Sequence, residues 1–135
     1  METKSNPITV TQEEYTIFKT LVENSHTVDP IEKRSHKKLY DELRTAIVVN
    51  ENKIPINTVR LNSVVTVQTS FGRKDGLQLV LPSEGDLSKR KLSIMSPMGA
   101  ALVGYVEGDS VSWNLPIGTE DILIEEVKNN KTPLS

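Results

Sequence analysis

Few side chains in this sequence of 135 residues carry the chemistry of a nucleophile or a metal ligand. The chain contains no cysteine, which excludes a disulfide framework, a thiolate nucleophile and a thiolate metal site. His26 and His36 have no partner at metal-ligand spacing, so we expect both to be solvated surface residues. The motifs of serine hydrolases, P-loop NTPases, dinucleotide-binding enzymes and zinc proteases do not occur. The sequence therefore predicts no cofactor and no enzyme of these classes.

An acidic pair, Asp29 and Glu32, is the remaining candidate for chemistry. Two carboxylates on one exposed helical turn could bind a hard cation such as Mg²⁺. Acidic side chains in a first helical turn also complement the helix dipole, and Asp29 stands at a good N-cap position before a proline. We favour the capping role and predict no metal site.

Two amphipathic helices must position this pair. Thr11 followed by Glu14 is a capping-box pattern, which predicts a first helix to about Asn24. A second helix begins at Asp29-Pro30 and keeps one narrow apolar stripe to about Ile47. At about 1.5 Å per residue the arms are ~20 Å and ~30 Å long. The short connection between them predicts a short antiparallel helical hairpin, a stubby coiled coil with the acidic pair at its tip.

A short helix and the strand that follows it are predicted around position 100. Ser96 can cap a short helix that starts at Pro97, where the missing N–H of proline costs nothing. Gly104 can adopt the left-handed conformation that ends this helix. The alternating run over 110–115 then predicts a strand, and we expect its Trp113, the only tryptophan, to lie in the core.

The rest of the chain after a polar linker over 48–55 shows the period of two that is typical of strands. The features predicted in chain order are a strand over about 62–70, a hairpin turn at Asp75-Gly76, a strand over 77–81, a turn over 116–119, a strand over 122–127 and a polar tail from Lys128. The sum is an α+β chain. Residues 1–50 form the helical hairpin, and residues 51–135 form an antiparallel sheet domain of four or five strands with one short helix.

Composition limits the partners. The chain has 16 basic and 18 acidic residues, a net charge of −2, and the same balance in each half. Nucleic-acid affinity depends on clustered lysine and arginine, so direct sequence-specific binding to nucleic acid is not indicated. No apolar run approaches the roughly 18 residues that span a bilayer, and the N-terminus lacks the apolar core of a signal peptide. We expect a cytoplasmic protein without a membrane partner; the oligomeric state stays open.

Several of these features recur together in one family. The C-terminal part resembles the FKBP-like domain of the bacterial transcript-cleavage factors GreA and GreB through Ser93-Ile94, Ser96-Pro97-Met98, Ala101-Leu102, Gly104 and Gly108-Asp109. Within that family it is most similar to the Rnk group, regulators of nucleoside diphosphate kinase, through Leu61-Asn62-Ser63, Met95, the run 97–104 and Trp113 with Leu115-Pro116. The resemblance covers about residues 55–127 and extends to the hairpin in architecture only.

The resemblance implies a regulator without enzymatic activity that binds bacterial RNA polymerase near its secondary channel and competes there with Gre cleavage factors. Ser93, Met95, Ser96 and Pro97 match the segment through which the family contacts polymerase, with Met95 where Gre factors carry an acidic residue. In that family a long coiled coil brings two tip carboxylates to the catalytic Mg²⁺. The hairpin here is too short for that reach, so transcript cleavage is not expected.

Two other functions remain as alternatives. One is Gre-like stimulation of transcript cleavage through Asp29 and Glu32. The other is a small FKBP-like module that binds peptides or isomerises prolyl bonds. That second chemistry needs a concave aromatic pocket, which 2 phenylalanines, 3 tyrosines and 1 tryptophan furnish poorly.

Overall fold

A computed structural model describes residues 7–115 and 118–129. Residues 1–6, the residues Pro116 and Ile117 of the predicted turn over 116–119, and the part of the predicted polar tail from residue 130 lie outside the described residues. The elements are β1 (Thr9–Thr11), α1 (Gln12–Glu23), α2 (Pro30–Arg44), β2 (Ile47–Val49), β3 (Val64–Thr69), β4 (Gly72–Val80), β5 (Lys91–Ser93), α3 (Pro97–Leu102), β6 (Ser110–Leu115) and β7 (Gly118–Lys128), with 3-10 turns η1 (Glu51–Lys53), η2 (Pro82–Glu84) and η3 (Leu87–Lys89).

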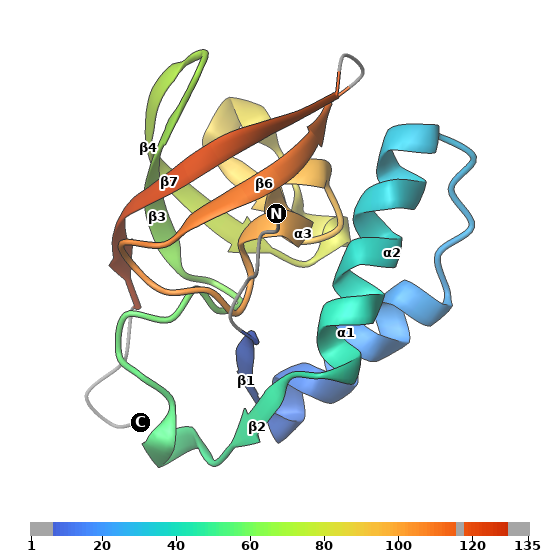
Figure 1. The fold of residues 1–135 in the computed structure, drawn as a ribbon, viewed down its shortest axis with the longest axis vertical. Helices are drawn as coiled ribbons and strands as arrows, with labels where there is room; N and C mark the ends of the chain where they lie inside the picture. The colour runs from blue at the N-terminus through green and yellow to red at the C-terminus, as the bar shows by residue number, and fades with distance from the viewer. Residues whose placement is uncertain (1–6, 116–117, 130–135) are drawn as a thin grey trace.

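The five-stranded sheet confirms the α+β class. Its strands follow the order β5-β4-β3-β7-β6, and Figure 1 shows the sheet curling around α3 while α1 and α2 lie along one side. Three of its neighbouring pairs are antiparallel, as expected, whereas β5 runs parallel to β4 with Leu79 opposite Leu92. The last strand begins at Gly118, earlier than predicted. The inner face of the sheet carries fully buried aliphatic side chains, among them Val65, Val67 and Ile124.

The caps of the helical hairpin are the predicted ones. Thr11 Oγ1 accepts a hydrogen bond from Glu14 N at 3.2 Å, and Asp29 Oδ1 accepts one from Ile31 N at 2.8 Å. The second helix ends at Arg44, three residues before the predicted end. Residues 47–49 instead form β2, which pairs in parallel with β1 at the root of the hairpin. No local sequence pattern predicts this small sheet, because each of its strands is only three residues long.

The predicted hairpin turn at Asp75-Gly76 is wrong. Both residues lie within β4, and the chain turns at Ser70 and Phe71. The register moves from Val65 opposite Leu77 to Val67 opposite Lys74, which places a bulge in β4 at the Asp75-Gly76 pair. Gly76 has φ +69°, a conformation that both a tight turn and a bulge require. The dipeptide therefore indicated the correct backbone conformation in the wrong structural context.

The hairpin packs on the sheet domain along its length. Helix α2 contacts α3 and β6, and Figure 1 shows the hairpin beside these elements at the right of the view. At the root, Thr9 N donates to Gly104 O at 3.1 Å, and Ile8 packs where a side chain at position 104 would lie. Tyr105 Oη donates to Glu42 Oε2 at 2.5 Å near the end of α2. The described parts of the hairpin and the sheet domain thus share one continuous core.

Candidate functional site

The start of α2 and the concave side of the sheet enclose a cleft of about 760 Å³. Its lining is largely apolar and includes Leu77, Leu92, Met98 and Trp113. Trp113 is half buried: it packs against the core, as expected, and it also lines this cleft. Its Nε1 atom is buried and has no hydrogen-bond partner among the described residues. Trp113 is the one aromatic residue in the described lining, which agrees with the expectation that this chain furnishes an aromatic pocket poorly.

The cleft brings together two predicted sets of residues. Asp29 and Glu32 line it from the hairpin, and Ser96 and Pro97 line it from the start of α3. Although these residues are more than 60 positions apart in the chain, they meet because α2 lies against α3. The structure describes Ser93 and Met95 as half buried and does not place them in the lining of this cleft.

The two carboxylates of the acidic pair both engage local hydrogen-bond donors. Asp29 accepts from the backbone of α2, and Glu32 Oε1 accepts from Thr27 Oγ1 at 2.6 Å. Thr27 Oγ1 also accepts from Asp29 N at 3.2 Å, so the tip is a closed capping network. Within the described residues, no three acidic or histidine side chains gather as metal ligands would. This geometry supports the capping role of the pair.

Replacing Asp29 with alanine is expected to lower the free energy of unfolding by about 1 kcal/mol, because α2 loses its N-cap. Urea denaturation followed by circular dichroism measures this change. Asp41→Ala is the control, since Asp41 makes only an exposed pair with Lys37. Equal stability of Asp29→Ala and the unmodified chain would contradict the capping role.

The segment from Ser93 to Pro97 is a tightly hydrogen-bonded turn. Ser96 Oγ donates to Ser93 O at 2.6 Å and accepts from Gly99 N at 3.1 Å, which caps α3 as predicted. Ser93 Oγ accepts from Met95 N at 3.0 Å. Ile94 is fully buried and anchors the turn, while the residues on either side are partly exposed. The turn therefore presents a fixed shape to solvent.

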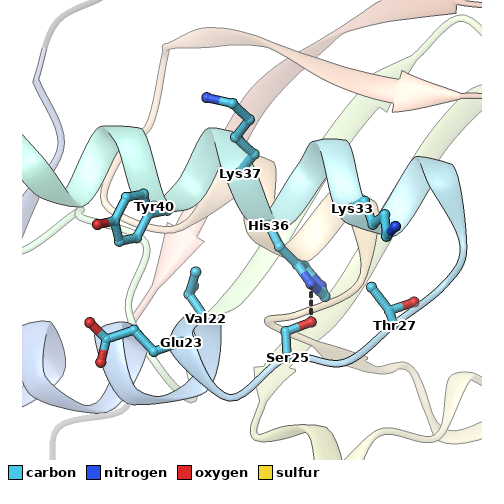
Figure 2. Close-up of a pocket in the computed structure, with 8 residues that line it drawn as sticks. All are labelled: Val22, Glu23, Ser25, Thr27, Lys33, His36, Lys37 and Tyr40. Atoms are coloured by element: carbon cyan, nitrogen blue, oxygen red, sulfur yellow. Dashed lines mark hydrogen bonds between the residues drawn. The ribbon is translucent and has the colours of Figure 1, made fainter.

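His36 holds this turn from the hairpin, and the prediction that it is a solvated surface residue is wrong. It is 8% exposed, its Nε2 lies 2.7 Å from Met95 O, and its Nδ1 lies 2.7 Å from Ser25 Oγ. Figure 2 shows the ring reaching from α2 towards Ser25, beside a second pocket of about 320 Å³ between the two helices. The burial depends on packing against a segment 59 residues away, which a helical pattern does not reveal. His26, by contrast, is exposed as predicted.

Charged side chains form the opposite wall of the cleft. Arg90 Nη1 contacts Asp75 Oδ1 at 2.9 Å, and this hydrogen bond is the main cause that lowers the pKa of Asp75 from its usual value. Arg73 Nε contacts Glu125 Oε1 at 2.9 Å, which raises the pKa of the guanidinium. These pairs are exposed, so they shape the rim and contribute little to stability.

Comparison with known proteins places these features in a family. A family model described as "Transcription elongation factor, GreA/GreB, C-term" matches residues 54–129. The regulator of nucleoside diphosphate kinase of Escherichia coli (strain K12) is 38% identical over 78 residues, which cover 57% of this chain and 57% of that protein. Transcription elongation factor GreA of Bradyrhizobium diazoefficiens is 31% identical over 114 residues, which cover 80% of this chain and 73% of that protein.

A solved structure shares the whole architecture. The structure titled as a prokaryotic transcription elongation factor GreA/GreB from Nitrosomonas europaea superposes with a TM-score of 0.71 at 30% identity, covering 93% of this chain and 100% of that one. The match to the E. coli regulator spans little more than half of that protein. Within the described residues, no helix has the length and apolar content that crossing a membrane requires. The chain belongs to the GreA/GreB family of transcription elongation factors, which it matches through the family's C-terminal domain.

Proposed function

We propose that this protein is a cytoplasmic regulator of the Rnk type that binds bacterial RNA polymerase near the secondary channel and has no enzymatic activity of its own. Residues 51–135 act as the docking domain and residues 1–50 as its helical hairpin. Docking uses Ser93, Met95, Ser96 and Pro97, and it excludes Gre cleavage factors that use the same site. Membership of the family supports polymerase as the partner, and the partly exposed turn over Ser93–Pro97 supports the docking site.

The observation that carries the proposal is the rigid presentation of the turn. Ile94 is buried, the hydroxyl groups of Ser93 and Ser96 are engaged within the turn, and His36 holds the carbonyl group of Met95. The partly exposed faces of Met95 and Pro97 are thereby fixed before any partner arrives. Preorganisation of this kind lowers the entropy cost of binding.

The geometry of the hairpin supports regulation without transcript cleavage. Helix α2 has 15 residues, which span about 22 Å at 1.5 Å per residue. It lies along the sheet domain, so its tip does not project away from the turn Ser93–Pro97, which we call the docking turn. The tip carboxylates are committed to capping. A catalytic role would need these carboxylates to reach a metal ion held deep within the partner.

Co-elution of the chain with core polymerase in size-exclusion chromatography tests the proposal. We expect binding at micromolar concentrations, and weaker binding by Pro97→Ala and Met95→Lys. Pro82→Ala is a matched control, because Pro82 is an exposed proline at the start of η2. Leu123→Lys is the control for an added charge on a partly exposed side chain. Adding GreA should displace the chain; no co-elution by the unmodified chain would overturn the proposal.

The cleavage alternative has its own measurement. A stalled, backtracked transcription complex should release no short 3′ fragment when the chain is added. Fragment release that disappears in Asp29→Ala would support the alternative and contradict a purely regulatory role.

The cleft favours a second candidate, the binding of a short apolar peptide. Trp113 is the only tryptophan and lines the cleft, so its fluorescence reports occupancy without a label. Proline-containing peptides that shift this fluorescence in the absence of polymerase, and whose prolyl isomerisation the chain accelerates, would support the module. An unchanged spectrum and rate would exclude it.

A further inference from the structure

His36 joins three segments that are separate in the sequence. The ring belongs to α2, Ser25 follows α1 in the loop of the hairpin, and Met95 lies in the docking turn. Both ring nitrogens lie 2.7 Å from an oxygen partner, and the residue is 8% exposed. A buried imidazole with both nitrogens satisfied has one favoured orientation.

The chemistry of the partners assigns the proton. A backbone carbonyl oxygen only accepts hydrogen bonds, so Nε2 of His36 must donate to Met95 O. In the neutral ring Nδ1 is then an acceptor, and the hydroxyl group of Ser25 donates a hydrogen bond to it. Two hydrogen bonds therefore follow one another, from Ser25 in the hairpin loop to His36 on α2, and from His36 to Met95 in the docking turn.

Other polar contacts hold the hairpin near its root. Tyr105 pairs with Glu42 close to the C-terminal end of α2, and Arg60 pairs with Glu14 in the first turn of α1. Nearer the tip, the hydrogen bond from His36 to Met95 links α2 to the sheet domain. Without it, α2 would still pack on α3 and β6, but its tip half would lose a directional bond to the sheet domain.

We propose that His36 is a positioning residue that locks the direction of the hairpin to the docking turn. The lock uses the carbonyl group of Met95, so it does not occupy the partly exposed side chain at position 95, which can contact a partner. A partner that holds the turn would then also fix where the hairpin tip points. This last consequence rests on the proposed function, whereas the lock itself does not.

Distance measurement by pulsed electron–electron resonance tests the lock in the isolated protein. The chain has no cysteine, so Val28→Cys at the exposed tip and Leu123→Cys on β7 give two specific spin labels. We expect one narrow distance distribution. His36→Ala should broaden it, and the exposed control His26→Ala should leave it unchanged.

Two further substitutions separate positioning from simple loss of packing. The side-chain nitrogen of glutamine can replace Nε2 and donate to Met95 O, so His36→Gln should restore most of the narrow distribution. Asparagine is too short to reach Met95, so His36→Asn should stay broad. A distribution in His36→Ala as narrow as in the unmodified chain, or equal widths for His36→Gln and His36→Asn, would overturn the lock. Circular dichroism melting confirms that each variant is folded.

Polymerase binding by the same variants distinguishes the two proposals. If the unmodified chain binds polymerase and His36→Ala leaves the distances unchanged, the lock fails and the proposed function stands. If His36→Ala broadens the distances and no variant binds polymerase, the lock stands and the proposed function fails. If both hold, His36→Ala should bind several-fold more weakly, and His36→Gln should recover the affinity.

Discussion

Gly99→Ala is expected to lower the free energy of unfolding by about 3 kcal/mol and to abolish docking on polymerase. A Cβ atom at position 99 would lie 2.1 Å from Ser93 O and 2.9 Å from Ile94 Cα. Both are backbone atoms of the docking turn, so no flexible side chain can move aside. The Ser93 carbonyl group also accepts hydrogen bonds from Ser96 N and Oγ, which any displacement would break.

The control for this substitution is Gly108→Ala. Gly108 has φ +96°, and a Cβ atom there meets nothing within 4 Å. Its cost is backbone strain alone, about 1–2 kcal/mol, and docking should persist. Urea denaturation and co-elution with polymerase measure both effects. If Gly99→Ala is no less stable than Gly108→Ala, the close packing of α3 on the docking turn is not needed for stability. If Gly99→Ala docks normally, that packing is not needed for docking.

Arg60→Met is expected to cost about 3 kcal/mol, because it leaves a buried carboxylate without its partner. Arg60 Nε donates to Glu14 Oε2 at 3.0 Å, and the Glu14 side chain is 9% exposed. The two Nη atoms bind Glu51 at 2.7 Å each, and this contact is the largest cause that raises the pKa of Arg60. The cluster joins α1, η1 and the start of the sheet domain.

A double substitution distinguishes an orphaned charge from lost packing. Arg60→Met with Glu14→Gln removes the buried charge, so it should recover much of the stability that Arg60→Met loses. Arg73→Met is the surface control, since its pair with Glu125 is exposed and should contribute little. Thermal unfolding of the four chains gives the comparison. No recovery in the double variant would show that the cost arises from packing of the arginine stem.

Local chemistry in the sequence was enough to predict the helix caps. Ser96 before Pro97 and Asp29 before Pro30 define helix starts with backbone rules that need no tertiary context, and both caps are confirmed. Gly104 has the predicted left-handed conformation, with φ +86°. The α+β class followed from the change of apolar period from helical to alternating.

Features that depend on tertiary packing could not be predicted in the same way. The parallel β1–β2 pair joins two three-residue strands that are separated by both helices, and the parallel β4–β5 pair depends on how the three-residue β5 packs beside β4. His36 has the spacing of a surface residue and is buried only because the turn at Met95 packs on α2. The cleft was not predicted either, because its walls come from both the hairpin and the sheet domain and form only when the two pack together.

Equilibrium titration of core polymerase tests the central claim most directly. Leu123→Cys carries a fluorescent label on an exposed position of β7, in a chain without other cysteines. We predict saturable binding at micromolar concentrations or below, competition by GreA and weakened binding by Pro97→Ala. The claim that this protein is a polymerase-docking regulator would be contradicted if the labelled chain does not bind in the titration and the unlabelled chain does not co-elute with polymerase.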